Sequence, residues 1–384
     1  MNILLAINNL GTGGAETFFC QLARSLAEKG NKVFIWQVFH PVHDHQYLDV
    51  LQHKNIVEFE FSREYSEFLR IDMPSIRRIW LVRNLRRKMK SLGIDVVNSH
   101  LFETDFYIAN LVNIPHVISM HGSYEMYYHN NDVYKKDSFY GSSDFNELLA
   151  LIFKKSNYII TAAQKNEETI LVHSKVPPHR MIYYGKNKIN RVNQSTSVRN
   201  IGMIARGIES KGWRILIECF KQLLNSNKDI TLTLGYTESE YMDILKEDNE
   251  SVANIHWKKN VTDLNTFFND LDLFVFPTRY PAESLPNVVI EALSYQIPVI
   301  STTIGEIPNM LRAKEGYAGI LLSKNDEESE MIENLRDVIE NLISKPSDYI
   351  QLKNQCESAF EKFDLSDNTE QYLSVFKQVL SCND

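Results

Sequence analysis

Residues 2–39 read NILLAINNLGTGGAETFFCQLARSLAEKGNKVFIWQVF, and this stretch decides the class of fold. A short, largely apolar run opens it, as in a buried strand, and a loop of glycines and small residues follows at 11–15. Residues 16–29 then carry apolar side chains at helical spacing, and Gly30 follows as a helix-ending glycine. A second apolar run begins at Lys32. This order is a βαβ unit, which predicts an α/β fold with a parallel sheet.

The same alternation continues along the chain and predicts two Rossmann-like domains. In the first series we expect strands at 95–99, 116–120, 158–162 and 181–184, and helices at 76–92, 104–112 and 165–173. In the second we expect strands at 200–204, 230–234, 253–257, 273–276 and 299–301, and helices at 212–224, 238–247, 262–269, 286–295, 326–341, 346–362 and 368–380. The polar stretch 185–198 reads as a linker. We therefore place the domains at 1–190 and 191–365, with the C-terminal helix, 366–384, as a candidate to pack back on the first.

Composition and charge exclude several classes of protein. With 384 residues, 43% apolar and 23% charged, the chain fits two soluble domains. It has no apolar stretch of membrane-spanning length, and we expect no signal peptide. Four scattered cysteines without a CxxC pattern indicate reduced thiols in a cytoplasmic protein. Residues 1–192 hold 23 Lys/Arg and 19 Asp/Glu (+4), and the remainder brings the net charge to −8. An acidic chain is a poor nucleic-acid binder, so we expect no nucleic-acid partner.

The strongest pattern for chemistry is PAESLPNVVIEA at 281–292. Its two glutamates, Glu283 and Glu291, act together best if the first lies in a loop and the second one or two turns into a helix. Pro286 suits a first helical position and favours that break. The amides around 284–287 would then meet a phosphate at the helix N-terminus. The two carboxylates would accept hydrogen bonds from hydroxyl groups, which a nucleotide sugar supplies on its ribose and its hexose.

The glycine loop at 11–15 leaves three interpretations open: a plain tight turn, a contact with an anion or a sugar, or a dinucleotide site. Its spacing is not GxGxxG. The second strand ends in residues 37–40 without the carboxylate that a nicotinamide cofactor's ribose requires. A dinucleotide site, and with it a nicotinamide oxidoreductase, is therefore disfavoured.

The segment ESLPNVVIEALSYQIPVI at 283–300 resembles the signature of the retaining GT-B glycosyltransferases of family 4. Four further segments resemble the family in order and spacing: GTGGAE at 11–16, MHG at 120–122, GMIARGIESKG at 202–212 and STTIGEIP at 301–308. The resemblance implies a GT-B fold, with two Rossmann-like domains whose parallel sheets face an interdomain cleft. Two positions depart from the family pattern. Residues 183–186 replace the usual Asn-Gly segment, and Glu306, which follows Gly305, would contact the donor sugar or point to solvent.

The resemblance also implies roles for individual residues. Arg206 and Lys211 would hold the donor diphosphate and stabilise the charge that builds on it as the sugar leaves. Glu291 would bind the ribose, and Glu283 the hydroxyls of the donor sugar. Together with His121, which the family places beside that sugar, Arg206, Lys211 and Glu283 make up the predicted catalytic group.

Further donor contacts are implied by the same resemblance. The amides of Ser284 and Leu285 would meet the phosphate or the sugar, and Gly13 and Gly14 would belong to the loop that closes over the donor. A histidine at the end of a strand is also often a structural residue, and this alternative stays open for His121.

The implied reaction transfers a sugar from a UDP- or GDP-sugar to a hydroxyl of a glycan or lipid-linked acceptor with retained configuration. The setting would be surface polysaccharide or lipopolysaccharide assembly. The family needs neither a metal nor a further cofactor, and we interpret Asp270-Leu-Asp272 as a structural turn. The alternative hypothesis is a non-catalytic GT-B-fold protein that binds or regulates a partner.

Acceptor contacts are assigned to His100, Tyr124 and Tyr127. The last two belong to the aromatic-rich stretch 124–145, which would either stack on sugars or form a lid or core packing. Residues 77–90 (RRIWLVRNLRRKMK) carry seven basic residues and no acidic one on an amphipathic helix. We expect its apolar face to pack on the sheet. Its charged face would either be solvated or touch an anionic membrane, at the inner face in a cytoplasmic enzyme.

Overall fold

The computed structural model describes residues 1–11, 13–39, 41–42, 47–61, 75–122, 124–130, 144–173, 176–189, 194–252 and 254–382, without the side chains of 75–78, 126, 127 and 130. The chain forms two compact units. Unit 1 comprises Met1–Gly185 and Leu365–Asp384, and unit 2 comprises Lys186–Asp364. The chain thus leaves unit 1 five residues before the predicted boundary at 190, inside the stretch interpreted as a linker. None of the helices in the described ranges is long and apolar enough to cross a membrane.

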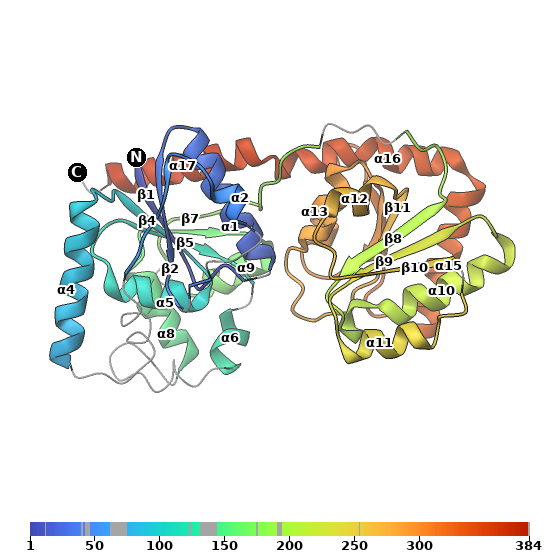
Figure 1. Ribbon diagram of the computed structural model, residues 1–384, viewed down its shortest axis with the longest axis horizontal. Coiled ribbons are helices and arrows are strands. Elements are labelled where there is room, and N and C mark those ends of the chain that lie inside the picture. Colours follow the sequence, from blue (N-terminus) through green and yellow to red (C-terminus); the bar gives the residue numbers. More distant parts are fainter. Residues whose placement is uncertain are drawn as a thin grey trace. The chain divides into compact units, whose positions relative to one another are not determined.

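Unit 1 is built on a parallel sheet of seven strands in the order β3-β2-β1-β4-β5-β6-β7 (Figure 1). Its central strands are buried along nearly their whole length, as expected for a sheet with helices on both faces. The strands are β1 (Asn2–Ile7), β2 (Lys32–Gln37), β3 (Ile56–Glu58), β4 (Val96–His100), β5 (His116–Met120), β6 (Tyr158–Thr161) and β7 (His179–Met181). The helices are α1 (Gly14–Glu28), α2 (Leu48–Leu51), α4 (Ser75–Ser91), α5 (Phe102–Leu111), α6 (Tyr124–Asn130), α8 (Phe145–Lys154), α9 (Gln164–Leu171) and α17 (Leu365–Ser381).

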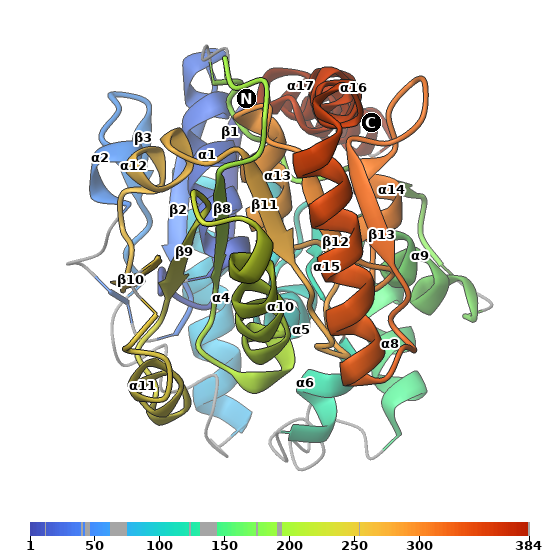
Figure 2. The same ribbon diagram turned by 90° about the vertical axis from the view of Figure 1, so that its right-hand side faces the viewer.

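Unit 2 repeats this plan with a parallel sheet of six strands in the order β10-β9-β8-β11-β12-β13, and Figure 2 shows α10 and α15 packed along each other beside it. The strands are β8 (Asn200–Ala205), β9 (Thr231–Tyr236), β10 (Ile255–Lys259), β11 (Leu273–Phe276), β12 (Val299–Thr302) and β13 (Gly319–Leu322). The α-helices are α10 (Trp213–Ser226), α11 (Glu240–Glu247), α12 (Leu264–Asn269), α13 (Asn287–Ser294), α14 (Ile307–Leu311), α15 (Glu328–Ser344) and α16 (Pro346–Phe360), and η1 (Glu209–Lys211) and η2 (Glu361–Phe363) are short 3₁₀ turns.

The predicted α/β class is confirmed, and the predicted strands at 116–120 and 273–276 have the observed bounds. Strands β3 and β13 were missed. Both are edge strands. Strand β3 has three residues of which two are exposed, so it lacks the continuous apolar run that marks a buried strand. Strand β13 does carry a short apolar run, and our prediction passed over it.

Helix α17 belongs to unit 1 although it ends the chain. The Thr369 hydroxyl donates to the Ser25 hydroxyl of α1 at 2.8 Å, and Lys29 forms an ion pair with Glu370 at 2.7 Å. Its buried Tyr372 hydroxyl lies 3.3 Å from the Ser119 hydroxyl at the end of β5. The C-terminal helix therefore closes one face of the first unit.

Both sheets reverse their strand order beside the first strand of the series, between β1 and β4 in unit 1 and between β8 and β11 in unit 2. Open parallel sheets bind ligands beyond the carboxyl ends of the strands at such a switch point. In unit 2 this edge holds the loops after Ala205 and Phe276. In unit 1 it holds the glycine loop after β1 and His100 at the end of β4.

Candidate active site

The two predicted diphosphate-binding cations lie around one aromatic ring in unit 2. Arg206 follows β8 directly, Lys211 ends η1, and Tyr280 lies in the loop after β11. The Arg206 Cζ is 5.0 Å and the Lys211 Nζ 4.5 Å from the centre of the Tyr280 ring. Such cation–π contacts hold both charges at the switch point. The structure therefore brings together the two residues on which the predicted donor site depends.

Lys211 is buried and bound to the first glutamate of the signature. Its Nζ donates to Glu283 Oε2 at 2.5 Å, and the same oxygen accepts from the Thr278 hydroxyl at 3.1 Å. Burial lowers the pKa of Lys211, and the neighbouring Glu283 carboxylate opposes that shift. Lys211 is only 5% exposed. A buried cation of this kind acts through a less screened field than a surface lysine does.

Arg206, by contrast, is exposed. Its backbone carbonyl accepts from the indole of buried Trp213 at 3.0 Å, which fixes the backbone at this residue. Among the residues the structure describes, no carboxylate pairs with its guanidinium. A held backbone and an unpaired guanidinium leave the five N–H donors of Arg206 available to an anion.

The loop of Glu283 is held by the turn at Gly305. Gly305 has a φ of +58°, and the amide of the next residue, Glu306, donates to the Ser284 carbonyl at 2.9 Å. A Cβ at Gly305 would overlap the carbonyl oxygens of Glu283 and Ser284. The glycine is required both by its backbone conformation and by this close approach.

We expect Gly305→Ala to unfold more easily than Gly316→Ala by roughly 2 kcal/mol, in chemical denaturation of each variant. Gly316 has a φ of +94°, but a Cβ added there would meet no other atom within contact distance. Gly316→Ala therefore has the conformational cost of a positive φ without the steric overlap. Equal stability of the two variants would contradict the proposed support of the Glu283 loop.

Glu283 and Glu291 are arranged as predicted, with Glu283 in the loop and Glu291 in the second turn of α13. The helix begins at Asn287, so Pro286 is the residue before it rather than the first helical residue. Glu291 is 5% exposed and forms an ion pair with Lys186, the first residue of unit 2. Glu291 is therefore a buried, paired carboxylate and not a solvated surface residue of the helix.

The structure also places Ser284, Leu285 and Glu306 of this loop region, and Asp272 before β11. Leu285 is buried, and Ser284 is partly buried. Glu306 is 2% exposed and accepts from the Asn309 side chain at 2.9 Å, so it does not point to solvent. Asp272 accepts from the amides of Arg199 and Asn200 at 2.9 and 2.8 Å, which confirms the structural interpretation of the Asp-Leu-Asp turn.

The predicted residues of unit 1 lie at the carboxyl ends of its strands. Gly13 precedes α1 in extended backbone, and Gly14 begins that helix. The Glu16 carboxylate packs against Gly13. Burial raises the pKa of Glu16. His121 follows β5, is 4% exposed, and has hydrogen bonds on both ring nitrogens, one with His100 and one with the Tyr184 hydroxyl. Burial lowers its pKa to about 3, so the ring is neutral at neutral pH.

The acceptor assignments are not upheld for two of the three residues. His100 and Tyr124 are both 0% exposed. The Tyr124 hydroxyl donates to Asp105 and its ring packs on Phe102, so it offers no face to a sugar. Tyr127 lies on α6, but its side chain is outside the described residues, as is the stretch 131–143 of the aromatic-rich segment.

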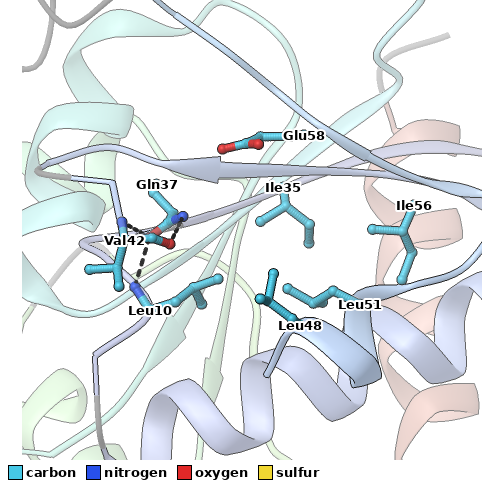
Figure 3. Close-up of a pocket in the computed structure, with 8 residues that line it drawn as sticks. All are labelled: Leu10, Ile35, Gln37, Val42, Leu48, Leu51, Ile56 and Glu58. Atoms are coloured by element: carbon cyan, nitrogen blue, oxygen red, sulfur yellow. Dashed lines mark hydrogen bonds between the residues drawn. The ribbon is translucent and has the colours of Figure 1, made fainter. Parts of the chain in front are cut away.

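Unit 1 also has a hollow lined by side chains of β2, β3 and α2 together with Leu10 and Val42 (Figure 3). At one end of it the Gln37 side chain accepts from the amides of Leu10 and Val42, each at 2.9 Å, and donates to the Val42 carbonyl at 3.0 Å. The Gln37 side-chain amide at the end of β2 thus holds the loop after β1 in place. A nicotinamide site would have a carboxylate at this strand end.

Sequence reasoning missed Tyr280, Lys186 and Tyr184 as members of these clusters. The signal for Lys186 and Tyr184 was present, because both fall in the segment 183–186 that departs from the family pattern. Tyr280 gave no signal of its own, since an isolated tyrosine near a strand end is most often part of the core. In the described ranges no group of three His, Cys, Asp or Glu side chains could hold a metal ion.

Two Rossmann-type units with paired cations at a switch point define a glycosyltransferase of the GT-B class. The chain belongs to the family 4, group 1 glycosyltransferases. The model described as "Glycosyltransferase Family 4" matches residues 12–185, and the one described as "Glycosyl transferases group 1" matches residues 198–341. These two matches correspond to the two structural units.

Relatives of known name differ in how much of the chain they match. The capsular polysaccharide biosynthesis glycosyltransferase CapM of Staphylococcus aureus is 29% identical over 156 residues, which are 38% of this chain and 37% of CapM. The chain therefore matches little more than a third of that relative's length. An uncharacterized glycosyltransferase of Haemophilus influenzae is 20% identical over 380 residues, 96% of this chain and 98% of its own.

Solved structures show the same fold over the whole chain. A glycosyltransferase from Rickettsia africae superposes with a TM-score of 0.75 at 14% identity, covering 98% of both chains. Anabaena Alr3699/HepE in complex with UDP and glucose superposes with a TM-score of 0.72 at 16% identity, covering 97% of this chain and 99% of that one.

Proposed function

We propose that the chain transfers a sugar from a UDP- or GDP-sugar to a hydroxyl of a glycan or lipid-linked acceptor, with retained anomeric configuration. The observation that carries the proposal is the cation pair of Arg206 and Lys211 around Tyr280 at the switch point of unit 2. A sugar bound to a diphosphate is the substrate that such a pair suits, because its leaving group gains negative charge in the reaction. The complexes of HepE with UDP and with UDP-glucose support a donor of this class.

In this reaction the bond between the anomeric carbon and the phosphate oxygen breaks, and its electron pair stays on the diphosphate. The acceptor oxygen forms the new bond to the anomeric carbon and gives up its proton to the departing diphosphate, whose oxygen has gained the electron pair. Arg206 supplies a planar fork for two phosphate oxygens, whereas Lys211 supplies a point charge whose position the Glu283 carboxylate fixes. We propose that these side chains and the amides of Ser284 and Leu285 do the work for which other transferases use a metal.

The two carboxylates are proposed to select the sugar nucleotide. Glu283 keeps one oxygen on Lys211 and Thr278, and its other oxygen is proposed to accept from a hydroxyl of the donor sugar. Glu291 is proposed to accept from the ribose hydroxyls beside its partner Lys186. In unit 1, His121 and the loop of Gly13 and Gly14 are proposed to contact the sugar end of the donor.

The acceptor is proposed to be a growing surface polysaccharide or lipopolysaccharide chain. The capsular polysaccharide relative CapM and the putative colanic acid biosynthesis glycosyltransferase WcaL of Salmonella typhimurium support this setting. A lipid-linked acceptor would be used at a membrane, for which the inner face is our proposal.

Helix α4 supports the membrane proposal. Its Leu81, Leu85 and Met89 are buried in the core of unit 1, as expected. On its other side Trp80 is 56% exposed, and Arg83 and Arg87 follow on the same exposed face at helical spacing. An exposed tryptophan beside basic side chains suits the boundary between anionic headgroups and acyl chains.

We expect the pair Arg83→Gln/Arg87→Gln to weaken sedimentation with anionic phospholipid vesicles by about 30-fold, at about 1 kcal/mol for each lost charge. The pair Lys165→Gln/Arg180→Gln removes the same charge from exposed positions of unit 1 outside α4 and serves as the control. Equal losses for both pairs, or a wild-type protein that does not sediment with vesicles, would contradict docking through α4.

The function is tested by incubating the protein with a panel of UDP- and GDP-sugars and measuring donor hydrolysis and binding. We expect either the UDP-sugars or the GDP-sugars to bind, and we expect slow hydrolysis of a bound donor to its free sugar. Binding by NADH, with none by UDP or GDP, would overturn the proposal.

A further inference from the structure

A chain of buried hydrogen bonds joins the ends of β4 and β5 to the last residues before the chain leaves unit 1. His121 Nε2 lies 2.8 Å from His100 Nδ1, and His121 Nδ1 lies 2.5 Å from the Tyr184 hydroxyl. His100 Nε2 lies 2.9 Å from the side-chain oxygen of Asn98. The Tyr184 ring stacks on Phe18 of α1, with ring centres 4.8 Å apart and an interplanar angle of 18°.

The donor and acceptor in each of these bonds follow from one backbone carbonyl. The Val117 carbonyl can only accept, and it lies 3.0 Å from the Asn98 side-chain nitrogen, which fixes the orientation of that amide. The Asn98 oxygen must therefore accept from His100 Nε2, which carries the proton.

The same logic continues into the second histidine. Burial holds the pKa of His100 well below its usual range, so its ring is neutral and its Nδ1 is an acceptor. His121 Nε2 must then be the donor in the bond between the two rings. His121 Nδ1 is left as an acceptor, and the Tyr184 hydroxyl donates to it.

His121 therefore has no free donor. Its single ring N–H is held by His100, and its single acceptor nitrogen is held by Tyr184. A substrate group can take up a hydrogen bond with this ring only by replacing the Tyr184 hydroxyl, and it must bring an N–H or O–H of its own. The hydrogen bond from Tyr184 to His121 Nδ1 is thus the one that a substrate hydroxyl could replace.

We propose that the Tyr184 hydroxyl occupies the acceptor nitrogen of His121 until a hydroxyl of the donor sugar replaces it. Tyr184 is then a positioning residue that makes His121 an acceptor specific for hydrogen-bond donors on the sugar. This inference rests on the proposed function, in which His121 contacts the donor sugar. It adds the direction of the hydrogen bond and the residue that competes for it.

The experiment compares Tyr184→Phe with Tyr372→Phe. Phenylalanine keeps the stacking on Phe18 and removes the competing hydroxyl. Tyr372 also has a buried hydroxyl, 3.3 Å from Ser119, but it does not take part in setting the His121 ring, because the Val117 carbonyl already fixes Asn98. Binding is measured by calorimetry with UDP-glucose and GDP-mannose, and with UDP and GDP alone.

We expect Tyr184→Phe to bind the sugar nucleotide that the wild type binds about five- to tenfold more tightly, because the sugar satisfies a buried acceptor that the variant leaves unpaired. Its affinity for the plain nucleoside diphosphate should match that of the wild type. Tyr372→Phe should bind both the sugar nucleotide and the plain diphosphate with wild-type affinity. A residue that only supports the fold would weaken sugar-nucleotide binding or leave it unchanged when lost, and either result would overturn the proposal. So would an equal gain for the plain diphosphate.

The tautomers are tested without any ligand by ¹⁵N NMR of histidine-labelled protein. We expect both His100 and His121 to carry the proton on Nε2, and a proton on Nδ1 of His121 would overturn the proposal. A wild-type protein that binds no nucleotide or sugar nucleotide would instead refute the proposed function. The NMR result separates these two failures.

Discussion

Lys211→Ala should lower kcat/KM by about 10²- to 10³-fold, the cost typical of removing one preorganised group that stabilises developing charge. It should also destabilise unit 2 by about 3 kcal/mol, because the variant leaves the buried Glu283 carboxylate without its cation. Both effects come from one ammonium group, and they are measured as steady-state kinetics and as denaturant unfolding.

A destabilised control separates the two effects. Lys362 in the same unit donates to the backbone carbonyls of Asn309 and Arg312 at 2.7 and 2.5 Å, and it is not part of the donor site. Lys362→Ala should lose stability and keep its activity below the unfolding transition. If the two lysine variants lost activity in proportion to their lost stability, Lys211 would have a structural role alone.

Arg206→Ala should lower kcat/KM by about 100-fold while its unfolding free energy stays within about 0.5 kcal/mol of wild type, as for an exposed side chain without an ion pair. The kcat/KM of Arg206→Lys should lie between those of the wild type and Arg206→Ala, because lysine keeps the charge and loses the bidentate fork. Arg214→Ala, which removes an exposed arginine of α10, is the matched control. A loss of stability in Arg206→Ala, or unchanged activity, would contradict the assignment.

Most of the fold was predictable from periodicity and glycine placement. The parallel sheets follow from strands that are apolar along their whole length, and α17 carries its own helical spacing. The two strands that escaped prediction lie at sheet edges. Two of the three residues of β3 are exposed, whereas β13 is apolar but only four residues long. The boundary between the units, at Gly185, could be located from composition only to within a few residues.

The candidate site was predictable as a set of residues but not as an environment. Spacing placed Glu283 in a loop and Glu291 in the next helix, since helix geometry constrains neighbours in sequence. It could not show that Lys211 is buried against Glu283, or that Lys186 covers Glu291, because those pairs join residues far apart in the chain. The burial of His100 and Tyr124 is likewise a tertiary property.

The central claim is that Arg206 and Lys211 bind a diphosphate. The most direct measurement is a calorimetric titration of the wild type and Arg206→Ala with UDP, UMP, GDP and GMP. We predict that one diphosphate binds at least about tenfold more tightly than its monophosphate, and that Arg206→Ala abolishes this difference. Equal affinity for the monophosphate and the diphosphate in the wild type would contradict the account.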